Sequence, residues 1–110
     1  MPTPMPTPFR CETHSGRDDA RVRPVGELDI ATVGRLDERL RELREAGGKR
    51  FVLDLRGLTF IDSTGLRLVF ELDSFARRDG IELSLVSGPR AVQRVFEVAG
   101  IAGLLPFRSP

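Results

Sequence analysis

The chain has 110 residues, which suits a single domain built around one hydrophobic core. Its 17 basic and 16 acidic side chains leave a formal net charge of only +1, and no block of basic residues is present, so direct binding to nucleic acid is not expected. No apolar run reaches the roughly 18 residues of a membrane span, and the start of the chain lacks the order of a signal peptide. We therefore expect a cytoplasmic protein with no membrane partner.

Cysteine and histidine each occur once, as Cys11 and His14. A single cysteine excludes an internal disulfide and a cysteine-built metal site, although an intermolecular bridge through Cys11 stays open. A lone histidine offers too few partners for a metal site or a Ser-His-Asp triad, and we interpret His14 as part of a hairpin turn. The sequence therefore predicts no metal and no other cofactor.

The first eight residues repeat the proline-rich unit MPTP. Such a segment cannot bury enough apolar surface to fold by itself. We expect residues 1–8 to form a disordered tail and residues 9–110 to form one domain.

A pair of strands is expected at the start of this domain, over residues 9–13 and 20–25 with a turn at 15–18. Pro24 removes a backbone donor within the second strand. Its position must therefore face a sheet edge, a bulge or the end of the strand.

Residues 32–46 follow the pattern of an amphipathic helix, with apolar positions at steps of three and four and charged residues between them. Asp29 or Thr32 could cap the start of this helix, and the two glycines at 47–48 end it. The apolar positions are Val33, Leu36, Leu40 and Leu43.

The second half of the chain alternates strands and helices, with strands at 51–55 and 81–86 and a helix at 63–78 between them. Strands joined through a helix should lie parallel, with a right-handed crossover. A third helix starts near Pro89, and a short apolar piece at 104–107 ends the pattern. The order predicts an α/β fold with a mixed sheet of four or five strands flanked by three or four helices.

Asp62, Ser63 and Thr64 stand where a strand gives way to the helix at 63–78. The first backbone N–H groups of a helix lack intrahelical partners and attract negative charge. Asp62 or Ser63 could simply cap this helix, and Gly65 could simply permit close packing. The same position also suits a phosphoserine, whose charge of roughly −1.5 to −2 would meet the helix dipole. The residues alone leave both interpretations open.

The helix at 63–78 has apolar residues on more than one face. Part of that surface is expected to stay exposed for a partner, although a helix held between a sheet and another helix is also broadly apolar. One apolar stripe contains Leu66, Val69, Phe70 and Ala76, and the other contains Leu68, Leu72 and Phe75.

Motifs of catalysis are missing, since the chain has no GxSxG elbow, P-loop or glycine-rich dinucleotide loop. Ser63 also has no neighbouring histidine or lysine in the sequence to activate it. Asp29, Asp54 and Asp62 could form a metal or acid/base group at the end of the sheet, but capping and turn roles are the preferred interpretation. We therefore expect a protein that is not an enzyme.

Three segments nevertheless come in the order and spacing of one family: GELDIATVGRL at 26–36, FVLDLRGLTFIDSTGLRLVF at 51–70 and GPRAVQRVFEVAGI at 88–101. On these segments the chain resembles a stand-alone STAS domain of the bacterial anti-sigma factor antagonist type, over about residues 9–107. The mixed sheet and flanking helices of that family agree with the order of elements given above.

The resemblance implies a phosphoacceptor at Ser63, with Thr64 as the fallback. It further implies that Asp29 lies near the same end of the sheet as Asp62, and that the helix from 65 to 75 supplies much of the partner-facing surface. The residues expected to bind the partner are Asp29, Asp62, Ser63, Thr64, Gly65, Leu66, Arg67, Val69 and Phe70.

The implied function is partner switching. The unphosphorylated protein would bind an anti-sigma factor that is also a serine kinase holding ATP or ADP, and would thereby release the sigma factor. Phosphorylation of Ser63 would end that binding, and a metal-dependent serine phosphatase would restore it. Three alternatives remain: a non-phosphorylated scaffold or regulatory subunit of a transporter or signalling complex, a nucleotide-binding STAS domain, and, for the apolar helix face, a weak homodimer.

Overall fold

The computed structural model describes residues 8–108, so the expected tail lies outside the described residues apart from Pro8. Within them, six strands form one sheet, accompanied by three α-helices and two short 3-10 helices. The strands are β1 (Arg10–Ser15), β2 (Asp19–Leu28), β3 (Arg50–Asp54), β4 (Leu58–Ile61), β5 (Glu82–Val86) and β6 (Phe107–Arg108). The helices are α1 (Val33–Glu45), α2 (Ser63–Asp79) and α3 (Arg90–Val98), with the 3-10 helices η1 (Leu55–Gly57) and η2 (Ala102–Leu104).

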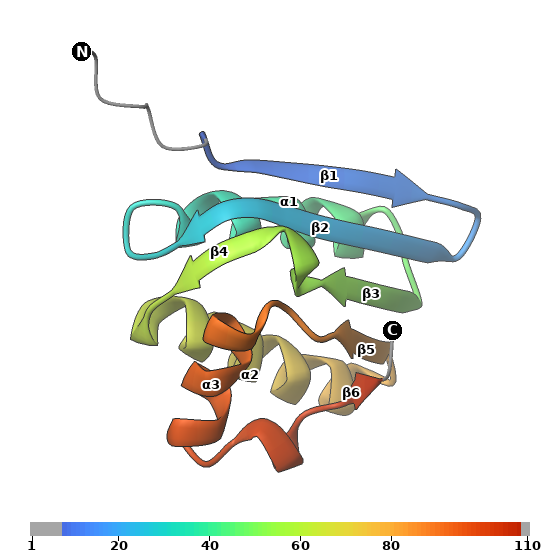
Figure 1. Ribbon diagram of the computed structural model, residues 1–110. Coiled ribbons are helices and arrows are strands. Elements are labelled where there is room, and N and C mark those ends of the chain that lie inside the picture. Colours follow the sequence, from blue (N-terminus) through green and yellow to red (C-terminus); the bar gives the residue numbers. More distant parts are fainter. Residues whose placement is uncertain (1–7, 109–110) are drawn as a thin grey trace.

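The sheet is mixed, as predicted. Strands β1 and β2 form an antiparallel hairpin, whereas β2–β3, β2–β4, β3–β5 and β5–β6 are parallel pairs. The order across the sheet is β1-β2-β3-β5-β6, and β4 pairs with the far end of β2 (Figure 1). Because parallel neighbours need long connections, α1, α2 and α3 each fall between two strands of the sheet.

Strand β2 is long enough to serve two parallel partners in turn. Its first half, at 19–22, pairs with β3, and its last residues, at 26–28, pair with β4. Pro24 stands between these two stretches, where η1 crosses and no parallel partner needs its missing N–H. A Cβ on Gly57 of η1 would lie only 2.8 Å from the carbonyl oxygen of Pro24, so only glycine lets the chain pass this closely.

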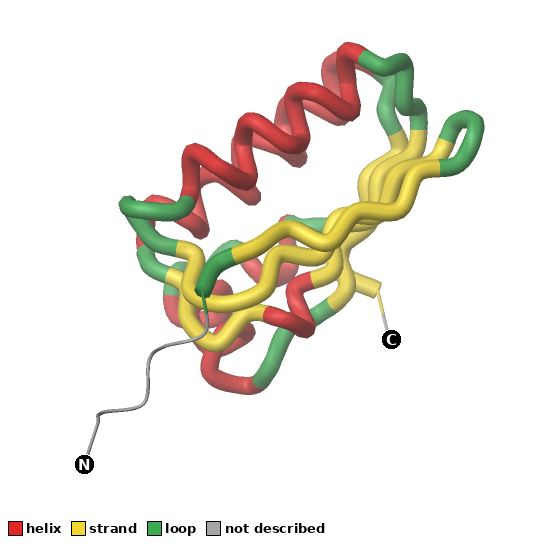
Figure 2. Tube along the Cα trace, turned by 90° about the horizontal axis from the view of Figure 1, so that it is seen from above, coloured by secondary structure: helices red, strands yellow, loops and turns green. Residues whose placement is uncertain are grey.

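Helices α1 and α2 cover one face of the sheet and enclose the core (Figure 2). The same core half-buries Cys11 of β1. Over the part of the sheet near the β1–β2 hairpin, the opposite face carries no helix (Figure 2). Most of the side chains on that face are polar and partly exposed. The fully buried side chains include Val22, Leu28, Leu36, Leu53, Leu55, Val69, Leu85 and Phe96.

Several element boundaries differ from the predictions. His14 lies in β1 rather than in the turn, because the hairpin turn is confined to residues 16–18. Pro89 is the N-cap of α3 and not its first helical residue. Among residues 8–108, no helix combines the length and the apolar character that a membrane crossing requires.

Candidate functional site

The site lies at the carboxyl end of the sheet, where β4 stops at Ile61 and α2 starts at Ser63. The residue between them, Asp62, donates its backbone N–H to the carbonyl oxygen of Leu28 at 3.2 Å. This bond fixes the end of β4 against the end of β2. It thereby places the start of α2 beside the loop that follows β2.

The carboxylate of Asp62 organises the first turn of α2. Its Oδ1 accepts the backbone N–H groups of Thr64 (2.9 Å) and Gly65 (3.1 Å) and the hydroxyl of Thr64 (2.5 Å), while its Oδ2 accepts the N–H of Ile30 (3.3 Å). The hydrogen bond from the Thr64 side chain is the largest influence on the pKa of Asp62, and with the backbone donors it holds that pKa below its ordinary value of 3.8. Asp62 is therefore the helix cap and is ionised at neutral pH.

Ser63 is the first residue of α2, and its side chain is exposed. Within residues 8–108 its hydroxyl makes no hydrogen bond, whereas the hydroxyl of half-buried Thr64 is held by Asp62. Of the two adjacent hydroxyls, the one on Ser63 is therefore the more accessible to another protein.

The loop after β2 is held by its own side chains. Oδ1 of Asp29 accepts the N–H of Ala31 at 2.9 Å, and the hydroxyl of Thr32 accepts the N–H of Asp29 (3.0 Å) and donates to the carbonyl oxygen of Glu27 (2.7 Å). Thr32 occupies the N-cap position of α1, but its hydroxyl caps no helical N–H. Neither of the two proposed caps of α1 therefore acts through its side chain, because both side chains close the loop instead.

Asp54 does not join Asp29 and Asp62. It lies at the end of β3, is 1% exposed and pairs with Arg56 and Arg21. No group of three or more metal-ligating side chains forms within residues 8–108. The three aspartates thus do not come together as a metal or acid/base site.

Two of the residues expected to bind a partner lie beneath the surface. A Cβ on Gly65 would come within 2.8 Å of Cγ1 of Ile61 and 2.9 Å of the carbonyl oxygen of Leu28, so glycine is needed for α2 to pack here. Val69 is fully buried. Gly65 and Val69 therefore hold α2 in place against the sheet, but they are not themselves exposed to a partner.

An apolar groove of about 370 Å³ lies beside Ser63, between α2 and α3. Leu66 forms the α2 side, and α3 contributes the rest. Val98 is 78% exposed there. The residues of α3 that line the groove are Ala91, Arg94, Val95, Val98 and Ala99.

The contribution of α3 to this groove was not predicted. Val92, Val95, Phe96 and Ala99 form the apolar stripe of that helix, and Val98 lies outside it. In the sequence, the position of Val98 outside this stripe was the one signal that α3 has apolar surface facing something other than the core.

The remaining predicted residues lie on other parts of α2. Arg67 is exposed and pairs with Glu71 at 3.0 Å, beside a hollow between α1 and α2 that Thr64 also lines. Phe70 is 42% exposed. Most of the second apolar stripe is covered, since Leu72 is buried and Leu68 packs against the core, so the exposed surplus on α2 is smaller than its sequence suggested.

A model of the STAS domain family matches residues 12–109, and the chain belongs to that family. An anti-sigma-B factor antagonist of Staphylococcus aureus (strain NCTC 8325 / PS 47) is 31% identical over 84 residues, which cover 76% of this chain and 78% of that protein. The anti-sigma-B factor antagonist of Staphylococcus epidermidis is 29% identical over 94 residues, covering 86% and 87%. Within the STAS family, the chain thus stands with the anti-sigma factor antagonists.

Solved structures share the fold. The anti-sigma factor antagonist SpoIIAA in its unphosphorylated form superposes with a TM-score of 0.75 at 20% identity, covering 94% of this chain and 88% of that one. An anti-sigma factor antagonist from Mycobacterium paratuberculosis gives 0.76 at 17% identity, covering 91% and 85%. By its similarity to anti-sigma factor antagonists, the chain is a regulatory protein rather than an enzyme.

Proposed function

We propose that this protein is the phosphorylation-controlled ligand in a partner switch. In its unphosphorylated form it binds an anti-sigma factor that is also a serine kinase, and the sigma factor is released. Phosphorylation of Ser63 ends the binding, and a metal-dependent serine phosphatase restores it, all in the cytoplasm. The observation that carries the proposal is the exposed, unbonded hydroxyl of Ser63 at the edge of an apolar groove.

The groove supplies the binding energy of the unphosphorylated state. Its walls, Leu66 on α2 and Val95 and Val98 on α3, are apolar, and covering them removes apolar surface from water. Arg94 at the same groove can pair with an acidic group of the partner. The names of the relatives support an anti-sigma factor as that partner.

A phosphate on Ser63 would oppose this interface in two ways. It would bring a dianion to the rim of an apolar contact, which adds a desolvation cost, and together with the ionised carboxylate of Asp62 it would concentrate negative charge that the partner's surface would have to accommodate. A coupling of about 1–3 kcal/mol changes affinity about 5- to 150-fold, which is enough for a switch. A related fold, SpoIIAA, has been solved in a phosphorylated form.

The test combines capture and affinity measurement. Ser63→Ala and wild type are used as baits in native lysate with ATP and magnesium, and mass spectrometry identifies partners and the modified residue of the wild-type bait. We expect a kinase-type anti-sigma factor on Ser63→Ala and phosphate on Ser63 of wild type. Affinity for that partner should then fall about 5- to 150-fold in Ser63→Asp relative to Ser63→Ala.

Ser15→Asp is the control, because Ser15 is exposed at the end of β1 and belongs neither to α2 nor to the groove. It should bind the partner as wild type does. Equal affinity of Ser63→Ala and Ser63→Asp would contradict the electrostatic switch. Capture of transporter components with no phosphate on Ser63 would favour the scaffold alternative instead.

A further inference from the structure

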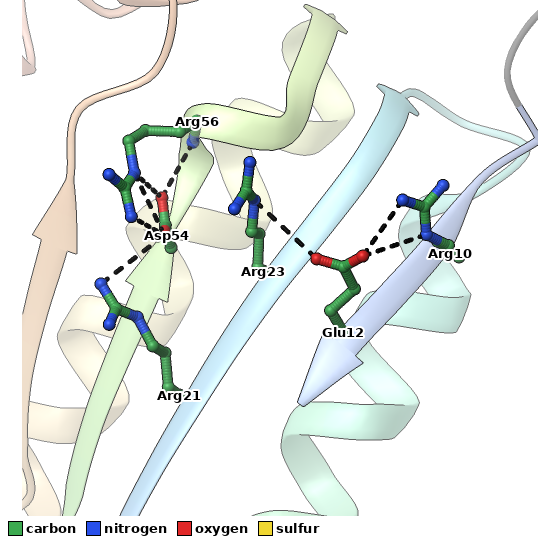
Figure 3. Close-up of polar contacts among 6 residues, drawn as sticks. All are labelled: Arg10, Glu12, Arg21, Arg23, Asp54 and Arg56. Atoms are coloured by element: carbon green, nitrogen blue, oxygen red, sulfur yellow. Dashed lines mark hydrogen bonds and ion pairs between the residues drawn. The ribbon is translucent and has the colours of Figure 1, made fainter. Parts of the chain in front are cut away.

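The helix-free face of the sheet carries a cluster of charged side chains that the switch does not use. Arg21 and Arg23 of β2 point to this face, since they alternate with the buried Ala20, Val22 and Pro24. Strand β1 brings Glu12 opposite Arg23, and η1 brings Arg56 beside Asp54 (Figure 3).

The cluster has an excess of positive charge. Arg56 holds buried Asp54 through both Nε (3.0 Å) and Nη2 (2.8 Å), and Arg10 holds Glu12 at 3.1 Å. Each of the two carboxylates thus already has a close arginine partner. Arg21 and Arg23 are additional guanidinium groups, and together they leave two positive charges unbalanced.

Arg21 and Arg23 are also short of acceptors. The nearest carboxylate oxygen lies 3.6 Å from Nη2 of Arg21 and 3.9 Å from Nε of Arg23, both beyond hydrogen-bond distance. Neither side chain makes a hydrogen bond within residues 8–108, and the Nε of Arg23 is a buried donor without a partner. The guanidinium groups of Arg21 and Arg23 therefore both lack a hydrogen-bond acceptor, and the two residues lie about 7 Å apart along β2.

These side chains enclose a pocket of about 150 Å³. His14, paired with Arg21 across the hairpin, also lines the pocket. A larger hollow of about 580 Å³ shares His14 and Arg21 and extends along β3 and β5, where Arg50, Glu82 and Ser84 line it. The pocket has the size of a single oxyanion, and the hollow could take an attached organic group.

We propose that this pocket binds a phosphate group, either as free phosphate or as a small phosphate ester. A tetrahedral dianion presents several oxygens in different directions, so it can accept from the forks of Arg21 and Arg23 at once and can balance the excess of two positive charges. The pocket is lined by residues of β1, β2, η1 and the end of β3, and it shares no residue with the groove beside Ser63. It is therefore a second site, independent of the partner switch.

The test uses the whole chain labelled with ¹⁵N, titrated with inorganic phosphate while sodium chloride keeps the ionic strength constant. We expect saturable shifts of amide and arginine Nε–H resonances confined to β1, β2, η1 and the end of β3. A parallel titration with glycerol 3-phosphate separates the two sources of the group. Tighter binding of the ester assigns an organic phosphate that uses the hollow, and equal or weaker binding assigns free phosphate.

Arg23→Gln removes one fork without touching a buried ion pair, and it should weaken phosphate binding at least about tenfold. Arg21→Gln should do the same, with thermal melting used to check that the loss of its contact with Asp54 leaves the chain folded. Arg78→Gln, an exposed arginine on α2, is the control and should bind like wild type. Shifts that rise linearly without saturation, or an Arg23→Gln variant that binds as tightly as wild type, would overturn the site.

Discussion

Asp62 decides where α2 begins, because its carboxylate accepts two backbone N–H groups of the first turn and the hydroxyl of Thr64. Replacing it with alanine should lower the free energy of unfolding by about 1 kcal/mol, the usual cost of losing an N-cap. Urea unfolding at pH 7 measures the change. Asp62→Asn is the control, since asparagine caps helices about as well and should retain most of the stability. An alanine variant as stable as wild type would show that the cap contributes nothing.

At the scale of single residues, the sequence predicted that either Asp62 or Ser63 is the N-cap of α2, but it did not distinguish between the two. Both residue types favour the N-cap, and they are adjacent. The choice depends on the direction in which the chain leaves β4, which is fixed by the bond from the N–H of Asp62 to Leu28 and by the bond that Asp62 accepts from Ile30. Those contacts join residues more than thirty positions apart, so no local pattern reports them.

At the scale of the element, the packing of α2 against the sheet depends on Gly65. Gly65→Ala should destabilise the protein by about 1–3 kcal/mol, because the added Cβ would meet the backbone oxygen of Leu28 and cannot be relieved by a side-chain movement. Gly34→Ala in α1 is the matched control, since a Cβ there meets nothing within 4 Å. That variant should gain about 0.5–1 kcal/mol from helix propensity. Denaturant midpoints of the two variants that move in the same direction would contradict this account.

The helices were the most predictable elements. In α1, the apolar residues from Val33 to Leu43 recur at helical spacing over several turns, and Gly80 marks the end of α2. The sequence therefore predicted the bounds of both helices to within a residue or two. The short 3-10 helix η1 was not predicted, because it interrupts what reads as one continuous apolar run, and it makes β3 and β4 separate strands. The use of α3 beside Ser63 was missed for a different reason: the pairing of two helices that lie far apart in the sequence is a tertiary property.

At the scale of the whole molecule, the buried carboxylate of Asp54 should make stability sensitive to acid. Burial raises the pKa of Asp54, but the hydrogen bonds and charge of Arg56, together with the charge of Arg21, outweigh that effect and hold the pKa below its ordinary value of 3.8. A carboxyl whose folded pKa is depressed stabilises the fold above the unfolded pKa. That contribution is lost as pH falls through the folded pKa.

The wild-type melting temperature should therefore drop as pH is lowered from about 5 to below 4. Asp54→Asn should be less stable at pH 7 by about 2 kcal/mol, through loss of charged hydrogen bonds, and should show a shallower drop in acid. Asp37→Asn, which removes an exposed i,i+4 pair with Arg41, is the control and should change stability by no more than about 0.5 kcal/mol. Parallel melting curves for Asp54→Asn and wild type would show that Asp54 is not responsible.

The class of the fold followed from the order of strands and helices, whereas the arrangement across the sheet did not. Nothing local indicates that β2 pairs with β3 at one end and with β4 at the other. The same long-range pairing brings Glu12 opposite Arg23 and Asp54 beside Arg21. The charged cluster on the helix-free face was therefore out of reach of any pattern along the chain.

Because Cys11 is half-buried, the rate at which its thiol is alkylated can report how often β1, the edge strand, detaches from the core. Burial raises the pKa of this sole thiol, against the opposing charges of Arg39 and Arg35, so little reactive thiolate forms at neutral pH. Alkylation should therefore be slow in the folded chain, and its rate should follow detachment of β1 from the core. If the rate rises at urea concentrations below the global transition, β1 opens as a separate unit. A folded-state rate equal to that of the unfolded chain would mean that the core does not shield this strand.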